Sequence, residues 1–315
     1  ITILSQAVTL VESSKYEHQQ VAQEIIEKCL PHAGKSVRIG ITGVPGAGKS
    51  TSIDAFGMHL IGQGRKLAVL AIDPSSERSK GSILGDKTRM EALSREKNAF
   101  IRPSPSAGSL GGVARKTRET IVLCEAAGFD TVFVETVGVG QSETAVHSMV
   151  DFFLLIQLAG TGDELQGIKR GIMEMADGII INKADGDNLE KAKLAAAQFR
   201  NALHLFPAPE SSWSPKVLTY SGYYNLGIKE IWDMVGEYME FTQKNGYFNY
   251  KRNEQAKYWM YESINDRPRE TFYHNPAVEK MLNFTEQQVL NNEISSFVAA
   301  KRMMDLFLEN LSAKK

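Results

Sequence analysis

Between Val37 and about Gln243, short uninterrupted apolar runs alternate with stretches that have helical periodicity. The runs cover residues 37–42, 67–73, 99–102, 131–135, 152–157, 178–182 and 216–221. Because these runs are apolar at consecutive positions and not at every second one, both faces of each strand are expected to be buried. A sheet with helices on both faces and right-handed crossovers meets this requirement. The pattern therefore predicts a doubly wound, mostly parallel α/β domain.

Helical patterns flank this central part on both sides. Residues 1–36 are expected to form helices, and after about residue 245 the pattern predicts further helices at 254–268 and 276–312. We therefore divide the chain into an N-terminal helical extension (1–36), a central α/β domain (37–244) and a C-terminal helical arm (245–315).

The last predicted helix carries an apolar seam. Its members follow alternating steps of four and three residues and include one lysine: Leu290, Ile294, Phe297, Lys301, Met304, Leu308 and Leu311. Such steps are typical of coiled-coil contacts. A short arm cannot bury this stripe by itself, so we expect a homodimer built partly from it. The alternative is a helix that packs against its own central domain.

Composition argues against several classes of partner. Lys and Arg number 36 against 37 Asp and Glu, which gives a net charge of -1 and no electrostatic basis for binding nucleic acid or an anionic membrane. The apolar run at 152–158 is too short to cross a membrane, and we recognise no signal peptide. The two cysteines, Cys29 and Cys124, form neither a disulfide framework nor a metal-ligand spacing, which favours a reducing compartment.

The strongest chemical motif is GVPGAGKS at residues 43–50, which fits G-x-x-x-x-G-K-[ST]. A buried strand precedes it and a helical stretch follows. In this context the glycines let backbone N–H groups turn toward phosphate oxygens, and the helix N-terminus adds partial positive charge. We expect Lys49 to reach the β and γ phosphates and the Ser50 hydroxyl to bind Mg²⁺. The predicted phosphate-binding residues are Gly43, Val44, Pro45, Gly46, Ala47, Gly48, Lys49, Ser50 and Thr51.

A second motif, NKAD at residues 182–185, follows the sixth strand and indicates the base. Asp185 can accept two hydrogen bonds from N1 and N2 of guanine, whereas adenine offers no such donor pair. We expect Asn182 to brace the loop and the stem of Lys183 to cover the base. A backbone amide of the turn Ser221, Gly222 and Tyr223 is expected to bind the guanine oxygen. These features favour GTP over ATP.

Three carboxylates are candidates for Mg²⁺ and for hydrolysis. Asp73 ends the second strand, Asp86 closes the polar loop that follows, and Glu135 ends the fourth strand. Carboxylates at these strand ends face the nucleotide crevice of such a sheet. Mg²⁺ prefers oxygen ligands and retains several waters, so not all three need bind it directly. For each, a strand-end residue that caps the next helix is the alternative.

The fourth strand is followed by a departure from the usual hydrolytic pattern. Gly138 stands where the glycine of D-x-x-G is expected, but the next residue is Val139 and not glutamine. Gln141 lies two residues further, on a loop with Gly138 and Gly140 that is expected to move easily. We therefore predict slow intrinsic hydrolysis until a partner orders residues 137–148 and 158–169 and brings Gln141 or a carboxylate such as Asp86 onto the attacking water.

A polar, glycine-containing loop after the fifth strand, residues 158–171, is a second candidate switch. Asp163 and Lys169 are expected to exchange partners when the nucleotide changes, and Lys169 to steady the switches during hydrolysis. A solvated loop with charged residues is the alternative.

Several strings resemble one family, the GTPases that serve adenosylcobalamin-dependent methylmalonyl-CoA mutase. They are TLVES, GVPGAGKST, IDPSS, GSILGDKTRM, RPSPSAGSLGG, ETVGVGQSE, AGTGDELQGIK and NKAD, and they extend over nearly the whole chain. The resemblance implies a G domain with an N-terminal helical extension and a C-terminal dimerisation arm. It also implies Mg-GTP hydrolysis coupled to loading and protecting the cobalamin of a partner mutase.

The resemblance also assigns residues. Asp73, Asp86 and Glu135 fall on the family's Mg²⁺ and hydrolysis carboxylates, and residues 158–169 fall on its third switch loop. It implies a location in the bacterial cytoplasm, or in the mitochondrial matrix if the source is eukaryotic. Three other functions are weighed against this one: a nucleotide-dependent GTPase of metallocentre assembly, a transport-associated kinase, and a nucleotide-gated binding module without meaningful turnover.

Overall fold

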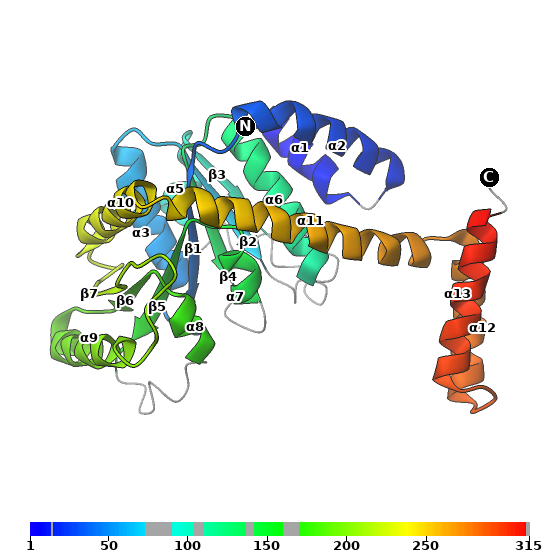
Figure 1. The fold of residues 1–315 in the computed structure, drawn as a ribbon. Coiled ribbons are helices and arrows are strands. Elements are labelled where there is room, and N and C mark those ends of the chain that lie inside the picture. The colour runs from blue at the N-terminus through cyan, green and yellow to red at the C-terminus, as the bar shows by residue number, and fades with distance from the viewer. Residues whose placement is uncertain (14, 73–89, 104–109, 137–141, 160–169, 313–315) are drawn as a thin grey trace. The chain divides into compact units, whose positions relative to one another are not determined.

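The computed structural model describes residues 1–13, 15–72, 90–103, 110–136, 142–159 and 170–312. In these ranges seven strands form one sheet, and every neighbouring pair is parallel (Figure 1). The strands are β1 (Val37–Gly43), β2 (Leu67–Ile72), β3 (Ala99–Arg102), β4 (Thr131–Thr136), β5 (Phe152–Leu158), β6 (Gly178–Asn182) and β7 (Lys216–Thr219). Each predicted strand is confirmed to within two residues, as is the α/β fold class.

The sheet order is β3-β2-β4-β1-β5-β6-β7, which places β1 between β4 and β5. The C-terminal ends of these three strands are therefore neighbours. β1 leads into the phosphate motif, β4 carries Glu135, and β5 precedes the loop at 158–171. The topology thus brings Glu135 next to Ser50 of the phosphate motif, 85 residues earlier in the sequence.

Helices cover both faces of the sheet. They are α1 (Thr2–Glu12), α2 (Tyr16–Cys29), α3 (Lys49–Gly62), α5 (Glu91–Ser94), α6 (Leu110–Ala126), α7 (Ser142–His147), α8 (Arg170–Met175), α9 (Leu189–Leu203) and α10 (Ile228–Lys244), with 3-10 turns η1 (Leu30–His32) and η2 (Gly186–Asn188). α3 and α10 pack on the face that presents Ile39, Phe133 and Leu154. α8 and α9 pack on the opposite face, against Leu155 and Ile179. Both faces of the strands are buried, as their continuous apolar sequences predict.

A network of buried charges lies at the N-terminal ends of β1 and β5. Arg38 of β1 and Glu125 of α6 form a two-pronged ion pair with N–O distances of 2.8 and 2.9 Å. Asp151, just before β5, accepts two hydrogen bonds of 2.7 Å from Arg252 of α11 (Tyr247–Tyr273). Because all four side chains are largely buried, each charge depends on its partner for the solvation that water would otherwise supply.

The chain divides into two compact units, Ile1–Ala256 and Lys257–Lys315. The second unit contains the end of α11 together with α12 (Pro276–Leu290) and α13 (Ser296–Ser312). Val278, Met303 and Phe307 form its small core. The predicted boundaries at 36/37 and 244/245 stay a prediction.

The second unit corrects one expectation. Residues 276–312 are largely helical as predicted, but the uninterrupted seam over 290–311 is wrong, because Asn292 adopts a left-handed backbone with φ of 58° and a turn separates α12 from α13. The predicted seam is consequently divided between two helices and the turn. On α13 the buried residues are Ala299, Met303 and Phe307. The last two lie one position before the seam residues Met304 and Leu308. The turn lets α13 fold back on α12, and this packing uses a different stripe.

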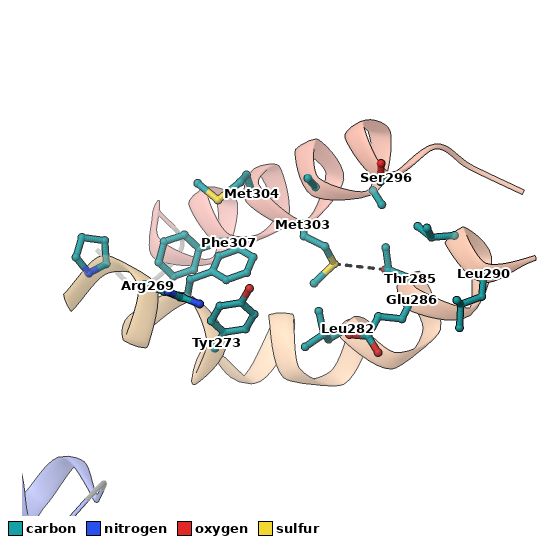
Figure 2. Close-up of a pocket in the computed structure, with 15 residues that line it drawn as sticks. Arg269, Tyr273, Leu282, Thr285, Glu286, Leu290, Ser296, Met303, Met304 and Phe307 are labelled. Carbon is teal, nitrogen blue, oxygen red and sulfur yellow. Dashed lines mark hydrogen bonds between the residues drawn. The ribbon is translucent and has the colours of Figure 1, made fainter. Parts of the chain in front are cut away.

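The end of α11 and the two following helices enclose an apolar pocket of about 830 Å³ within this unit. Figure 2 shows Met303 and Phe307 among its lining residues, with Thr285 donating a hydrogen bond to the Met303 sulfur at 3.4 Å. The seam residues of α13 remain exposed outside the core, with Phe297 87% and Leu308 53% accessible.

No helix in the described ranges is long and apolar enough to cross a membrane.

Candidate functional site

The phosphate motif forms the connection between β1 and α3. Gly48 precedes the helix with φ of 84°, a conformation that favours glycine, and a Cβ added there would lie 2.6 Å from the side-chain nitrogen of Asn182. Lys49 begins α3, and its Nζ donates to the carbonyl oxygens of Gly43 at 2.8 Å and Val44 at 3.4 Å. The loop is therefore wrapped around the lysine that the motif assigns to the β and γ phosphates.

Two carboxylates lie near Lys49. Burial lowers the pKa of Lys49, and the charges of Glu135 and Glu143 act in the opposite direction. Glu135 lies at the end of β4 and is 9% exposed. Glu143 lies in the first turn of α7 and is 4% exposed. Both negative charges help to keep the buried lysine protonated, the form that binds phosphate.

The residues present fit a magnesium ion. The Ser50 hydroxyl donates to Glu135 Oε1 over 3.4 Å, so a hydroxyl and a carboxylate oxygen converge beside the phosphate loop. Oxygen donors of this kind are the ligands that Mg²⁺ prefers. At the ends of the same strands, the Thr136 hydroxyl donates to the Thr42 hydroxyl at 2.8 Å and connects β4 to β1. This contact fixes the two strand ends that carry Glu135 and the phosphate loop.

Asn182 connects the phosphate loop to the segment predicted to bind the base. Its Nδ2 donates to the Ala47 carbonyl at 2.7 Å. Its Oδ1 accepts from the amides of Lys183 at 2.7 Å and Gly222 at 3.2 Å. One side chain that is 3% exposed thereby contacts three loops. The sequence assigns Asn182 a bracing role within its own loop, and the structure extends these contacts to the phosphate loop.

The two base segments face each other across this asparagine. Asp185 accepts a hydrogen bond from the Ser221 hydroxyl, so the carboxylate predicted to bind guanine lies beside the turn predicted to bind its oxygen. Lys183 has a left-handed backbone with φ of 59°. Tyr223, by contrast, is 81% exposed. A pocket of about 760 Å³ opens next to this turn, and Thr51, Gly222 and Tyr223 are among the residues that line it.

Several predicted residues lie outside the described residues: Asp73, Asp86, Gly138, Val139, Gln141, Asp163 and Lys169. Their metal, catalytic and switch roles stay predictions. So do the binding roles of the residues that the structure brings together, which are the phosphate loop from Gly43 to Thr51 with Glu135, and Asn182, Lys183 and Asp185 with Ser221, Gly222 and Tyr223.

Sequence reasoning missed two residues at this site. Glu143 belongs to the string ETVGVGQSE, but a glutamate in the first turn of a helix usually faces solvent, so nothing in the pattern indicated burial near Lys49. Tyr220 follows β7 and is 1% exposed directly behind Gly222. The signal available for Tyr220 was its place between a buried strand and the SGY turn.

Comparisons with known proteins agree on one family. The family model described as "Methylmalonyl Co-A mutase-associated GTPase MeaB" matches residues 4–277. The GTPase ArgK of Escherichia coli K12 is 45% identical over 302 residues, which cover 96% of this chain and 91% of that protein. The mitochondrial methylmalonic aciduria type A homolog of Mus musculus is 45% identical over 314 residues, covering 96% of this chain and 76% of that protein.

A solved structure shares the fold. The crystal structure of an LAO/AO transport system kinase matches with a TM-score of 0.73 at 38% identity, covering 97% of this chain and 92% of that chain. The phosphate loop, the NKAD segment and the sheet that joins them thus occur together in a chain whose relatives are GTPases. This protein is a GTPase, and it belongs to the MeaB family of methylmalonyl-CoA mutase-associated GTPases.

Proposed function

We propose that this protein is a Mg²⁺-dependent GTPase chaperone for an adenosylcobalamin-dependent acyl-CoA mutase of the methylmalonyl-CoA mutase type. In this role the nucleotide gates the loading and protection of the mutase cofactor. The observation that carries the proposal is the match of residues 4–277 to a mutase-associated GTPase family. The fit of the site to guanine nucleotide supports the hydrolytic half of it.

In the proposed site Lys49 leaves the carbonyls of Gly43 and Val44 for the β and γ phosphates, and the neighbouring amides of the loop bind the remaining oxygens. Ser50 and Glu135 would hold Mg²⁺, with Asp73 and Asp86 as further candidate ligands, and the ion would offset negative charge on the phosphates. The charges of Glu135 and, to a smaller extent, Glu143 oppose the lowering of the Lys49 pKa by burial and so favour its protonated form.

Base selection follows from the contacts of Asp185 and Gly222. The carboxylate accepts from N1 and N2 of guanine, and the Gly222 amide, now 3.2 Å from Asn182 Oδ1, donates to the guanine oxygen. Adenine would leave both groups without a complementary partner, at a cost of about 1–3 kcal/mol for the buried Gly222 amide and less for the half-buried Asp185. GTP is therefore favoured over ATP.

Slow intrinsic turnover is part of the proposal. Val139 takes the place next to the D-x-x-G glycine and can neither orient water nor offset charge. A mutase that orders residues 137–148 and 158–169 would place Gln141 or Asp86 on the water and Lys169 against the switches. Orientation alone lowers such a barrier by several kcal/mol.

The proposed homodimer uses the second unit. On α13 the exposed apolar side chains Phe297, Met304, Leu308 and Leu311 form a stripe that the unit's own core leaves uncovered. A second copy that buries this stripe would shield it from water. Phe297→Glu combined with Leu308→Glu should convert a dimer into a monomer in sedimentation experiments. If the double variant sediments like wild type, the stripe is not the interface.

Two alternatives make different predictions. A metallocentre-assembly GTPase would bind a transition metal as cargo, and a nucleotide-gated module would bind a partner without turnover. A location in the bacterial cytoplasm, or in the mitochondrial matrix of a eukaryote, is part of the proposal, and a bacterial and a mitochondrial relative support it.

A pull-down tests the proposal. The protein, immobilised with a non-hydrolysable GTP analogue, should retain an adenosylcobalamin-dependent mutase from a lysate of its source organism, and with GDP it should retain a different amount. The Asp185→Asn variant supplied with the GTP analogue is the matched control, because it should lose the nucleotide-dependent difference. Failure to retain any mutase, or equal retention with both nucleotides and without them, would contradict the chaperone role.

A further inference from the structure

The turn that presents Gly222 rests on a buried tyrosine. Tyr220 is 1% exposed, and its backbone lies beside the NKAD segment: its amide donates to the Ile181 carbonyl and its carbonyl accepts from Ala184, both at 2.9 Å. Its side chain turns back under Gly222. A Cβ added to Gly222 would lie 3.0 Å from the Tyr220 hydroxyl oxygen, so a larger residue there would require the tyrosine to shift by a few tenths of an ångström.

The hydroxyl itself has an unusual environment. It makes no hydrogen bond of ordinary geometry to any residue in the described part of the chain. Burial raises the pKa of Tyr220 to about 12, and the Ser52 hydroxyl of α3 opposes that effect. The Ser52 hydroxyl therefore lies within interaction range of the phenol. Phenylalanine would fill the same space without burying a polar atom, so the hydroxyl requires an explanation.

Three polar groups meet here, and the hydrogen bonds between them are long enough to shorten. The Asn182 amide reaches the Ser52 hydroxyl at 3.5 Å, a long contact. The Gly222 amide reaches Asn182 at 3.2 Å. Tyr220 lies between Gly222 and Ser52. The cluster thus joins the first turns of the helix after the phosphate loop to the turn beside Asp185, and its hydrogen bonds are loose.

We propose that Tyr220 is a positioning residue for guanine recognition, whose hydroxyl pairs with Ser52 when nucleotide binds and so holds the Gly222 amide toward the guanine oxygen. The inference rests on the proposed binding of guanine by this turn. It adds a residue that touches neither base nor phosphate. Its effect passes through Gly222 and is confined to nucleotides that present an oxygen at the six position of the base.

The experiment compares Tyr220→Phe with a matched control. Tyr238→Phe makes the same change at another tyrosine that is 1% exposed, whose hydroxyl interacts with the buried Asp177 carboxyl and with no group of the base turn. Tyr238 packs in α10 against Phe152 and Trp213, at the start of β5 and away from the base turn. Affinities for GTP, inosine triphosphate and ATP are measured by titration, and stability by urea unfolding.

Tyr220→Phe should weaken GTP and inosine triphosphate by the same factor, about three- to tenfold, the range of one neutral hydrogen bond. ATP affinity should not change, and resistance to urea should equal or exceed that of wild type because an unpaired buried hydroxyl is removed. Tyr238→Phe should leave all three affinities unchanged. Ser52→Ala should weaken GTP less in the Tyr220→Phe background than in wild type.

Other results overturn the inference. If Tyr220→Phe keeps full GTP affinity, the hydroxyl does not position the turn. If Tyr220→Phe lowers the affinity for ATP as much as that for GTP and also lowers stability, the role of the hydroxyl is only structural. If the Ser52→Ala effect is fully additive, the connection to α3 is wrong. If wild type itself fails to prefer GTP over ATP, the proposed guanine site is wrong and the inference falls with it.

Discussion

Asn182→Asp tests whether one side chain holds the phosphate loop and the base segment together. The substitution preserves volume and the acceptor Oδ1, which receives the amides of Lys183 and Gly222. It replaces the donor Nδ2 by an oxygen and adds a negative charge to a site that is 3% exposed, which increases the cost beyond that of a neutral acceptor. That oxygen would face the Ala47 carbonyl across the 2.7 Å now occupied by a hydrogen bond.

The magnitude follows from this exchange. Loss of one hydrogen bond costs about 0.5–1.5 kcal/mol, and a buried acceptor left facing another acceptor costs about 1–3 kcal/mol. The two loops can move apart in the free protein, but nucleotide binding requires both in place, so most of the cost falls on binding. A loss of about 2–4 kcal/mol corresponds to GTP binding weakened by roughly 30- to 1000-fold.

Titration of a fluorescent GTP analogue measures the effect, and urea unfolding shows whether the variant is folded. Asn245→Asp is the matched control, because Asn245 Nδ2 also donates to a carbonyl, that of Ser211 at 3.0 Å, but the side chain is exposed and remote from the site. It should leave GTP affinity unchanged. A folded Asn182→Asp protein that binds GTP within threefold of wild type would refute the reasoning.

Three further predictions concern the site and its support. Asp185→Asn should weaken the binding of GTP by about 2–3 kcal/mol and raise the affinity for xanthosine triphosphate relative to that for GTP. If wild type and variant bind GTP equally well in titrations, the base assignment is excluded. Ser50→Ala should raise the Mg²⁺ concentration needed for half-maximal hydrolysis, so a Mg²⁺ titration identical to wild type would exclude the ligand role. Glu125→Gln should destabilise the fold by about 3–5 kcal/mol in urea, because it leaves Arg38 buried without its carboxylate, whereas Glu240→Gln on the surface should have no measurable effect. Burial raises the pKa of Glu125, but Arg38, the Ser36 hydroxyl and the Gly34 amide outweigh burial and lower this pKa below its ordinary 4.5. The contribution of Glu125 to the free energy of unfolding is therefore complete above pH 4.5 and is lost as the pH falls through the lowered pKa. Glu125→Gln should abolish this pH-dependent loss.

The sheet could be predicted from the sequence because burial on both faces leaves a continuous apolar signal. All seven strands were located in this way, and the phosphate and NKAD motifs fixed which strand ends matter. The strand order could not be predicted, since nothing local states that β4 lies beside β1. The adjacency of Glu135 and Ser50 depends on that order.

The C-terminal helices show where periodicity misleads. The seam from Leu290 to Leu311 is regular in sequence, yet the chain turns at Asn292 and buries Met303 and Phe307 instead. Heptad spacing describes which side chains align in a straight helix, and it carries no information on where the helix ends. Asn291 and Asn292 were the available local signal, because asparagine tolerates the left-handed conformation that ends a helix.

Contacts between side chains far apart in the sequence were also beyond prediction. Asn182 was expected to brace its own loop, but its bond to Ala47 joins residues 135 positions apart. Glu143 and Tyr220 are polar residues whose burial depends on the packing of α7 and β7. Their types alone predict solvent exposure for glutamate and only partial burial for tyrosine.

Single-turnover GTP hydrolysis, measured with and without an adenosylcobalamin-dependent mutase, tests the central claim most directly. The isolated protein should hydrolyse GTP slowly, and the mutase should accelerate it about tenfold or more, which is ~1.4 kcal/mol of barrier. Lys169→Ala should remove most of that acceleration while leaving the slow intrinsic rate in place. Hydrolysis that is equally fast with and without the mutase would contradict the account, and acceleration that survives Lys169→Ala would contradict the part assigned to that residue.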